Sequence, residues 1–368
     1  MVAIIMAGGS GERFWPLSRQ QRPKQLLRLT RSGRTLVEET VERLHGLIPA
    51  DNIYVLTSAG LQGTLRRMLP QLPPAHIIAE PLRRNTAACL VLAAAVVAER
   101  FQEQDVVVAA FPSDHLVEPV EEFQRTLRVA LHWAEQSDDV VTIGISPTRP
   151  ETGYGYIEVG EELQRFEGVP VYRVHRFREK PSREVAEEFV QSGTAFWNSG
   201  MFFWRLKVFL AALPVHMPAF WRRWEELRQA VRRSAGIWEG PYPGTESVFA
   251  ELPDISIDYA LAERTERMAM VRASFRWDDL GAWDALERVF PPDTDGNVVS
   301  GDVILQDCTG CIVVDARTGA RPVVTLLGLR ECVVVLTDDA LLCCAKSHVQ
   351  HVRRIVAYLR HQGYEAVL

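Results

Sequence analysis

Short apolar runs alternate with amphipathic stretches through the first 145 residues of the chain. The runs that predict strands are residues 2–6, 53–57, 76–79, 106–111 and 140–145, and the stretches that predict helices are residues 35–44, 86–100 and 121–134. Strands that alternate with helices form mostly parallel sheets covered by helices. The pattern therefore predicts an α/β fold in which strands alternate with helices.

The second half of the chain has a different pattern. Beyond residue 150 the periodicity loosens into Gly- and Trp-rich segments, and a basic, Trp-containing helical stretch follows over residues 214–235. We expect an insertion there that builds a wall of a substrate site. After residue 292 come short β-branched runs at 298–305, 311–314 and 332–336, and then a closing helix over 349–359. This change predicts a boundary near residue 290 and domains over residues 1–290 and 291–368.

Composition and charge narrow the classes of function. A chain of 368 residues fits one large domain with a smaller one appended. Its formal net charge of −6 argues against a general nucleic-acid binder, which needs an excess of Lys and Arg. The longest strongly apolar stretch, residues 87–98, is well short of the roughly 20 residues that span a bilayer, so we expect no membrane span.

The cysteines and the N-terminus point to one compartment. The apolar run of residues 2–7 leads directly into glycines and indicates a first strand rather than a signal peptide. The chain has 6 cysteines, which without a secretory leader do not indicate a disulfide framework. We therefore expect a reducing, cytoplasmic location.

A glycine-rich loop follows the first predicted strand. Residues 8–11 read Gly-Gly-Ser-Gly, which leaves backbone N–H groups free to approach an anion, and a following helix N-terminus would add a favourable dipole. Arg13 and Lys24 supply positive charge. A dinucleotide fingerprint would need glycine at Phe14, and the Walker pattern is absent. The loop predicts a phosphate site of another kind; a simple strand-to-helix turn is the alternative.

Two acids lie where a metal could bind beside phosphates. Asp114 follows the predicted strand 106–111 at the carboxyl end, where ligand sites of open α/β sheets lie. Asp278 and Asp279 follow Trp277 at another strand-to-turn junction. Magnesium is usually held by one or two carboxylates with phosphate oxygens and water. Each acid taken alone fits a turn or cap equally well.

These residues together resemble the signature of the sugar-nucleotide pyrophosphorylases. The run 8–24, with Trp-Pro-Leu-Ser-Arg at 15–19 and Pro-Lys-Gln at 23–25, is most similar to the branch that uses mannose 1-phosphate and GTP. The resemblance covers most of the chain, since it continues through Asp114 and the segments 179–181, 198–200, 256–259 and 277–283. It implies a Rossmann-like, mixed and mostly parallel sheet of the nucleotide-diphospho-sugar transferase type. It also implies a small β-rich C-terminal domain, in the form of a short β-helix, that can serve formation of a homodimer.

The resemblance implies Mg²⁺-dependent transfer of GMP from GTP to mannose 1-phosphate with release of pyrophosphate. It gives catalytic roles to Arg13, Lys24 and Lys180, and metal ligation to Asp114 and Asp279, the latter preferred to Asp278 by the spacing of the family motif. The residues implied to bind the nucleotide are Ala7, Gly8, Gly9, Ser10, Gly11, Glu80, Pro81, Asn85, Thr86 and Ala87. Those implied to bind the sugar phosphate are Tyr154, Gly155, Glu179, Lys180, Asn198 and Asp258.

Chemistry supports parts of this interpretation and leaves alternatives open. A carboxylate such as Glu80 can accept from the N1 and N2 donors of guanine, which uracil and thymine lack, although residues 80–87 also fit a capped helix start. The attacking phosphate oxygen is already anionic, so no side-chain base is required. The acid Glu12 beside the loop departs from a simple phosphate site. Glucose 1-phosphate with UTP, dTTP or ATP is one alternative pair of substrates, and a catalytically silent nucleotide-sugar-binding regulator is another interpretation.

Three further signals favour plainer interpretations. Cys308 and Cys311, with the pair at 343–344 and His348 and His351, match no usual zinc spacing and indicate small core residues. The Trp- and Arg-rich stretch 221–233 indicates an amphipathic helix over the insertion rather than a nucleic-acid face. Some relatives carry a fused isomerase domain, for which this chain is too short, so we expect no isomerase activity.

Overall fold

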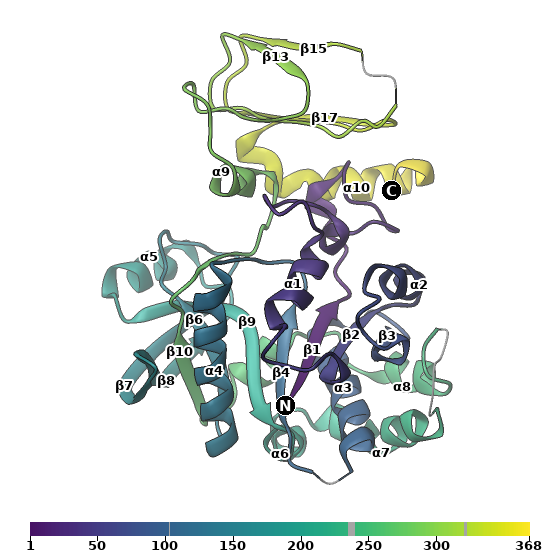
Figure 1. The fold of residues 1–368 in the computed structure, drawn as a ribbon, viewed down its shortest axis with the longest axis vertical. Coiled ribbons are helices and arrows are strands. Elements are labelled where there is room, and N and C mark those ends of the chain that lie inside the picture. The colour runs from purple at the N-terminus through teal and green to yellow at the C-terminus, as the bar shows by residue number, and fades with distance from the viewer. Residues whose placement is uncertain (103, 235–239, 320–321) are drawn as a thin grey trace. The chain divides into compact units, whose positions relative to one another are not determined.

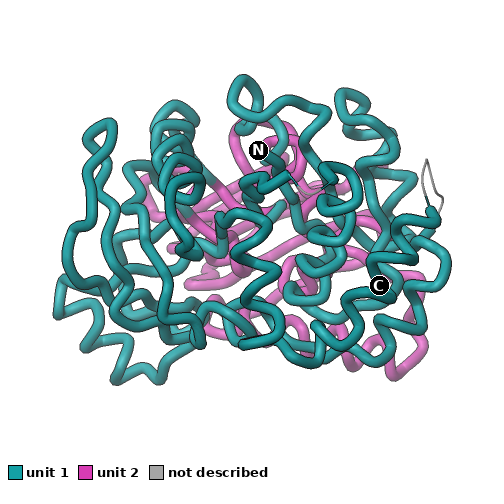
Figure 2. Tube along the Cα trace, turned by 90° about the horizontal axis from the view of Figure 1, so that it is seen from below, with its two compact units in different colours: residues 1–8, 40–113, 117–277 teal, residues 9–39, 114–116, 278–368 magenta. Residues whose placement is uncertain are grey.

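The computed structural model describes residues 1–102, 104–234, 240–319 and 322–368. The chain divides into two compact units, coloured separately in Figure 2. Unit 1 holds residues 1–8, 40–113 and 117–277, and unit 2 holds residues 9–39, 114–116 and 278–368. Most of the glycine-rich loop therefore belongs to the same unit as the C-terminal segment. The division into domains over residues 1–290 and 291–368 stays a prediction.

Unit 1 is built on one sheet (Figure 1). Its strands are β1 (Val2–Ala7), β2 (Ile53–Ser58), β3 (Ile77–Glu80), β4 (Val107–Pro112), β6 (Val140–Ile145), β7 (Tyr156–Phe166), β8 (Val169–Arg178), β9 (Ala195–Arg205) and β10 (Met268–Arg272). In the described part of the chain these strands form a 9-stranded sheet in the order β3-β2-β1-β4-β9-β6-β10-β8-β7. Strands β3, β2, β1 and β4 are mutually parallel, β9 is antiparallel to both β4 and β6, and β10 is parallel to β6. The predicted α/β class with a mixed sheet is confirmed.

Helices cover both faces of this sheet. They are α2 (Ala59–Met68), α3 (Asn85–Phe101), α4 (Val120–Gln136), α5 (Arg183–Ser192), α6 (Leu206–His216), α7 (Pro218–Arg233) and α8 (Thr245–Glu251). Side chains alternate between the faces of a strand. Phe202 and Trp204 accordingly pack in one cluster with α3, α6 and α7, whereas Phe203 contacts Phe111, which contacts Phe123 of α4. Helix α4 lies in front of the strands of the sheet in Figure 1.

Unit 2 contains stacked parallel strands. The parallel strands are β12 (Val298–Ser300), β13 (Val303–Gln306), β14 (Ile312–Asp315), β15 (Val324–Leu327) and β16 (Cys332–Leu336). Strand β17 (Leu341–Ala345) pairs antiparallel with β16, and helices α9 (Leu286–Val289) and α10 (Val352–His361) precede and follow the strands. Strands β12, β14 and β16 pair in parallel, as do β13 and β15, which gives the short coils of a β-helix. A hydrophobic cluster joins Val333 and Val335 of β16 to Val352 and Val356 of α10.

Three short elements lie where the chain passes from one unit to the other. They are α1 (Leu36–Leu44), β5 (Leu116–Glu118) and β11 (Arg276–Asp278). No helix in the described residues is long and apolar enough to cross a membrane.

The structure corrects several predicted elements. The helical stretch expected over 214–235 is the end of α6 and then α7, separated at Met217, and residue 235 lies outside the described residues. The amphipathic helix expected over 221–233 is α7, and its apolar face packs on α3. The run 298–305 is two strands, because Gly301 turns the chain with φ +107°. The closing helix begins at Val352, and a 3₁₀ turn occupies Lys346–His351. The elements that were not predicted include strands β7, β8, β9 and β10 of the main sheet, strands β15 and β17 of unit 2, and helices α2, α5 and α8.

Candidate active site

A hollow of about 350 Å³ in unit 2 gathers the phosphate loop and both candidate metal acids. We call it the phosphate pocket. The residues that line it are Ser10, Gly11, Glu12, Arg13, Lys24, Asp114, His115, Asp279, Gly281 and Arg353. The structure thus brings together the residues expected to bind phosphate and those expected to bind metal, from segments more than 250 positions apart in the sequence.

Lys24 connects the two acidic segments of the phosphate pocket. Its side chain is buried, and Nζ lies 2.8 Å from Oδ2 of Asp114 and donates to the backbone carbonyl of Asp279. Burial acts to raise the pKa of Asp114, but the Lys24 ammonium and the nearby His115 outweigh it and hold that pKa below its ordinary value. Asp114 is therefore a carboxylate at neutral pH, held beside a fixed cation.

The loop itself is held open for an anion by glycine. Gly11 has φ +60°, and a Cβ there would lie 2.2 Å from Cβ of Lys24, so no other residue fits without moving the backbone. The Ser18 hydroxyl donates to the Gly11 carbonyl at 2.8 Å and fixes the turn. The expected helix N-terminus is absent here, because the loop continues into a single 3₁₀ turn, Glu12–Phe14. Side-chain cations, rather than a helix dipole, give this pocket its positive charge.

Asp278 and Asp279 have different environments. Asp278 is buried, its carboxylate is paired with Arg288, and it accepts from the Leu280 N–H at 2.8 Å, so it holds the turn together. Asp279 lines the phosphate pocket, and its carboxylate lies over Gly281, 3.1 Å from where a Cβ would be. The geometry therefore agrees with the preference for Asp279.

The donor set of the phosphate pocket suits a hard divalent cation. Asp114 and Asp279 present carboxylate oxygens to one pocket, and oxygen ligands are the ones that Mg²⁺ prefers. No group of three or more His, Cys, Asp or Glu side chains that could enclose a metal occurs in the described ranges. Two carboxylates therefore fit an ion that takes its remaining ligands from phosphate and water.

Two cations on the C-terminal helix complete this part of the site. Glu12 lines the pocket, and Nη2 of Arg360 on α10 lies 3.1 Å from its carboxylate, which neutralises the acid that departed from the expected pattern. Arg353, also on α10, lines the pocket directly. Neither arginine was predicted. No sequence motif marks them, because they lie in a helix that is far along the chain from every recognised motif.

The segments expected to bind the nucleobase lie in unit 1. An oxygen of Glu80, at the end of β3, lies 2.9 Å from where a Cβ of Gly8 would be, so a side chain at this position would displace the carboxylate from its place. Burial raises the pKa of Glu80 to about 7, against the effects of a hydrogen bond from Cys89 and of nearby Arg83. Glu80 can therefore exist in either protonation state near neutral pH.

The start of α3 is tied to a second segment of unit 1. Asn85 has φ +61°, and its side-chain oxygen accepts from the Thr86 N–H at 3.0 Å. The Thr86 hydroxyl accepts from the Ile257 N–H at 2.8 Å, and the Ala87 N–H donates to the Ile255 carbonyl. Pro81 follows β3 directly. These contacts position the segment that contains Asp258 relative to the expected base-binding residues.

A polar cluster in unit 1 contains all the residues expected to bind the sugar phosphate. The Asn198 amide donates to Asp258 at 2.9 Å, its oxygen accepts from the Thr142 hydroxyl at 2.8 Å, and its backbone N–H donates to Gly155. Nζ of Lys180 lies 2.6 Å from Glu179. Thr142 was missed by sequence reasoning because it lies inside an apolar strand.

Close packing fixes the geometry of this sugar cluster. A Cβ on Gly155 would lie 2.6 Å from Oε2 of Glu179, so the glycine allows that carboxylate to approach. The Tyr154 ring packs edge-on against Trp197 and Trp277, each with centroids 5.2 Å apart. Lys180 has φ +45° and its N–H donates to the Tyr154 carbonyl, which joins the two segments.

Two carboxyls of the sugar cluster share one cation. Burial, followed by the charge of Asp258, raises the pKa of Glu179, while Lys180 opposes the shift. Burial also raises the pKa of Asp258, against its hydrogen bonds and the charge of Lys180. Lys180 therefore opposes protonation of both carboxyls, and its ammonium is paired with Glu179.

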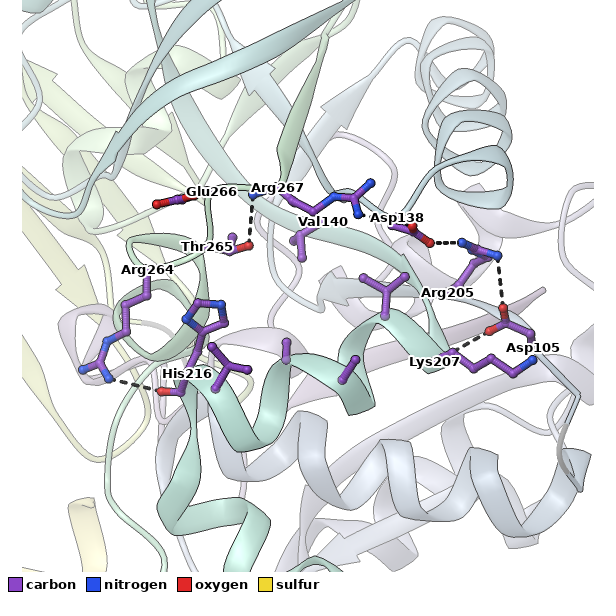
Figure 3. A pocket seen from close by; sticks show the side chains of 14 residues that line it. Asp105, Asp138, Val140, Arg205, Lys207, His216, Arg264, Thr265, Glu266 and Arg267 are labelled. Atoms are coloured by element: carbon purple, nitrogen blue, oxygen red, sulfur yellow. Dashed lines mark hydrogen bonds and ion pairs between the residues drawn. The ribbon is translucent and has the colours of Figure 1, made fainter.

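A larger hollow of about 810 Å³ in unit 1 lies away from these residues (Figure 3). It is lined by the end of β9, the start of β6 and one side of α6, and this is the sheet edge opposite to the carboxyl ends of β1 and β3. Its charges are largely paired: Arg205 contacts Asp105 at 3.2 Å and also Asp138. This hollow offers no arrangement of groups for phosphoryl chemistry.

The cysteines of unit 2 are mostly core residues. Cys308 and Cys311 are buried in a cluster with Val313 and Val334, as the sequence predicted. The same interpretation is wrong for Cys343, whose side chain is exposed on β17, where alternate residues face solvent.

Comparisons with known proteins agree with this arrangement. A model of the nucleotidyl transferase family matches residues 2–296, and one described as the MannoseP isomerase/GMP-like beta-helix domain matches residues 301–359. The chain is 38% identical to the alginate biosynthesis protein AlgA of Pseudomonas putida, over 99% of this chain and 72% of that protein. It is 35% identical to a mannose-1-phosphate guanylyltransferase of Klebsiella pneumoniae, over 98% of this chain and 74% of that protein.

A solved structure extends the similarity to the whole fold. The crystal structure of a mannose-1-phosphate geranyltransferase from Thermus thermophilus is 35% identical and matches with a TM-score of 0.83. The match covers 98% of this chain and 99% of that one. The β-helix-like coils of unit 2 are therefore part of a shared architecture.

Proposed function

We propose, from the premise that this chain belongs to the nucleotidyl transferase family, that it transfers GMP from GTP to α-D-mannose 1-phosphate, forming GDP-mannose and pyrophosphate. The observation that carries the proposal is the phosphate pocket, where Lys24 connects Asp114 to the backbone of Asp279. Relatives named for mannose-1-phosphate guanylyl transfer support the choice of substrates.

In this proposal the phosphate pocket receives the triphosphate. Arg13 and Lys24 neutralise charge on the departing pyrophosphate, and backbone N–H groups of the loop approach the phosphate oxygens. Asp114 and Asp279 would hold Mg²⁺, which supplies charge neutralisation on the phosphates when bound. Lys24 contributes by ion-pairing with phosphate or with Asp114, and both interactions keep the pocket electrically balanced.

Residues of unit 1 would provide selectivity for guanine. An ionised Glu80 accepts from the N1 and N2 donors of guanine, and the Cβ-free Gly8 leaves room for its carboxylate. A uracil or thymine ring offers no such pair of donors. Pro81, Asn85, Thr86 and Ala87 would form the rest of the base-binding segment.

The sugar cluster would hold mannose 1-phosphate through two kinds of contact. Glu179 and Asp258 accept from sugar hydroxyls, and Asn198 adds a donor from a buried position. Lys180 contacts the phosphate and offsets its repulsion from the triphosphate. Tyr154 and Gly155 border the ring.

The reaction needs no side-chain nucleophile. An oxygen of the sugar phosphate, anionic at neutral pH, attacks the α-phosphorus of GTP in line. A new P–O bond forms as the bond to the β-phosphate oxygen breaks, and its electron pair leaves with pyrophosphate. Positioning and charge neutralisation therefore supply most of the rate enhancement.

Two alternatives keep the fold and change the function. The same chemistry with glucose 1-phosphate and UTP, dTTP or ATP would use the phosphate pocket unchanged. A silent nucleotide-sugar-binding regulator would not need Arg13, Lys24, Asp114 and Asp279 together, and all four line the pocket here. We further propose that the enzyme works in the cytoplasm on small molecules, without nucleic acid or membrane, and that unit 2 can support a homodimer.

The test is pyrophosphate release from each ribonucleoside triphosphate and dTTP, crossed with mannose 1-phosphate and glucose 1-phosphate, with and without Mg²⁺. We expect release that requires Mg²⁺ and is strongest with GTP and mannose 1-phosphate. Another preferred pair would overturn the substrate assignment and keep the mechanism. Binding of a nucleotide sugar without turnover of any pair would favour the regulator.

A further inference from the structure

Helix α10 is fixed against the turn that carries Arg13. Val352 and Val356 are buried in the same hydrophobic cluster as Phe14 and Trp15, and the Trp15 indole donates to the Val367 carbonyl at 2.7 Å. The Arg360–Glu12 ion pair ties the far end of the helix to the same turn. Side chains on this face of α10 are therefore held in a defined place beside the phosphate loop.

Arg353 is the residue of α10 that lines the phosphate pocket. Within the described ranges it makes no ion pair and donates no hydrogen bond to protein. The pocket's other basic side chains do have partners: Lys24 contacts Asp114, and Arg13 donates to the Gly281 carbonyl at 3.3 Å. A guanidinium that lines a pocket, is exposed and has no protein partner is available to an anionic ligand.

The charges of the pocket indicate which ligand this is. Glu12 is neutralised by Arg360 and Asp114 by Lys24, so Arg353 adds positive charge that these acids do not cancel. Guanidinium groups bind phosphate oxygens through two parallel N–H donors, a geometry that lysine lacks. The nucleobase and sugar segments contribute no residue to this pocket.

We propose that Arg353 binds the β- and γ-phosphates of the nucleotide and the pyrophosphate that they become, so that the C-terminal helix contributes a catalytic residue. This inference rests on the proposed function for the reaction, but it concerns only the phosphate end of the substrate. It assigns a direct role in turnover to helix α10, in addition to the loop and turn residues of the same pocket.

The test uses the full chain in the reverse reaction, in which pyrophosphate and the nucleotide sugar are varied separately. We expect Arg353→Ala to raise KM for pyrophosphate about tenfold, with KM for GDP-mannose within about twofold of wild type. Arg353→Lys should raise KM for pyrophosphate by less than Arg353→Ala does. Arg354→Ala, an exposed neighbour outside the pocket, is the matched control and should behave as wild type.

Calorimetric titration with magnesium pyrophosphate provides a readout that does not depend on turnover. Weaker binding by Arg353→Ala than by Arg354→Ala supports the inference, even if the wild type prefers another substrate pair or none. Equal pyrophosphate affinity and equal KM in folded Arg353→Ala and wild type would overturn it. An increase in KM for GDP-mannose alone would also overturn it, because the arginine would then act at another site.

Discussion

Nζ of Lys24 lies 2.8 Å from the carboxylate of Asp114 and donates to the backbone of Asp279, so one side chain contacts both acids proposed to hold the metal. Loss of the Lys24 side chain removes a cation and leaves the Asp114 carboxylate without its partner. Loss of the Asp114 side chain removes a proposed metal ligand and leaves the Lys24 ammonium without its partner. The pair therefore links the electrostatics of phosphate binding to those of metal binding, and the predictions start there.

Removal of either member of this pair should nearly abolish turnover. We expect Asp114→Ala and Lys24→Ala each to lower kcat by about a hundredfold or more, since each removes a preorganised charge from the phosphate pocket. Pyrophosphate release measures the effect. Asp254→Ala, at an exposed position, is the control for loss of one acid. Near-normal rates in folded Asp114→Ala would contradict the assignment of the pocket.

The adjacent acids of the turn should separate activity from stability. Asp279→Asn should raise the Mg²⁺ concentration needed for half-maximal rate and leave Tm nearly unchanged. Asp278→Asn should instead weaken the contact with Arg288 and lower the free energy of unfolding by about 2 kcal/mol. Thermal melts and Mg²⁺ titrations of both variants decide the matter. The reverse pattern would make Asp278 the ligand.

Glu80 should make base recognition depend on pH. Its pKa is about 7, so the carboxylate that accepts from guanine is lost as pH falls below that value. We expect kcat/KM for GTP to fall between pH 7.5 and 6, measured against ITP, which lacks the N2 amine. In Glu80→Gln the ratio of kcat/KM for GTP to kcat/KM for ITP should become small and independent of pH. A pH profile identical in wild type and Glu80→Gln would exclude Glu80 from recognition.

The same carboxyl should lower stability at alkaline pH. Between its unfolded pKa near 4.5 and its folded pKa near 7 the folded state binds more protons, so the free energy of unfolding falls as pH rises through this window. Glu80→Gln should therefore raise the free energy of unfolding at pH 8 by at most about 3 kcal/mol, and leave it unchanged at pH 4.5. The difference is measured as a higher Tm at pH 8. Glu246→Gln, on the exposed side of α8, is the control.

Lys180 should affect the sugar phosphate more than the nucleotide. Lys180→Ala removes the cation proposed to contact mannose 1-phosphate, so its KM should rise about tenfold or more while KM for GTP changes little. The loss also leaves Glu179 and Asp258 without their shared cation. Arg183→Ala, an exposed cation three residues away, should leave both constants unchanged. Equal increases in both KM values would indicate a general loss of structure.

Sequence patterns predicted the α/β core well because buried parallel strands are continuous apolar runs. Residues 140–145 match β6 in full, and the phosphate loop was found from its glycines and cations. Helix α2 was missed because its polar and glycine residues weaken the periodicity. The sugar cluster could be found only by resemblance, since Asn198 and Asp258 meet through tertiary packing.

Other features could not be predicted from local sequence. Arg353 and Arg360 reach the phosphate loop because Val352 and Val356 bury one face of α10, and no motif marks that contact. The different environments of Asp278 and Asp279 depend on Arg288, which spacing does not reveal. A residue's partner across hundreds of positions is a property of the fold.

The contact between Trp15 and the Val367 carbonyl has a consequence for biosynthesis. The nascent chain emerges from its N-terminus, so the phosphate loop leaves the ribosome long before the residues that pack on its turn. Until α10 has followed, Phe14 and Trp15 lack part of their apolar surroundings. Catalytic competence should therefore appear only after residues 352–367 have left the ribosome, and a ribosome stalled before residue 352 would carry an inactive chain.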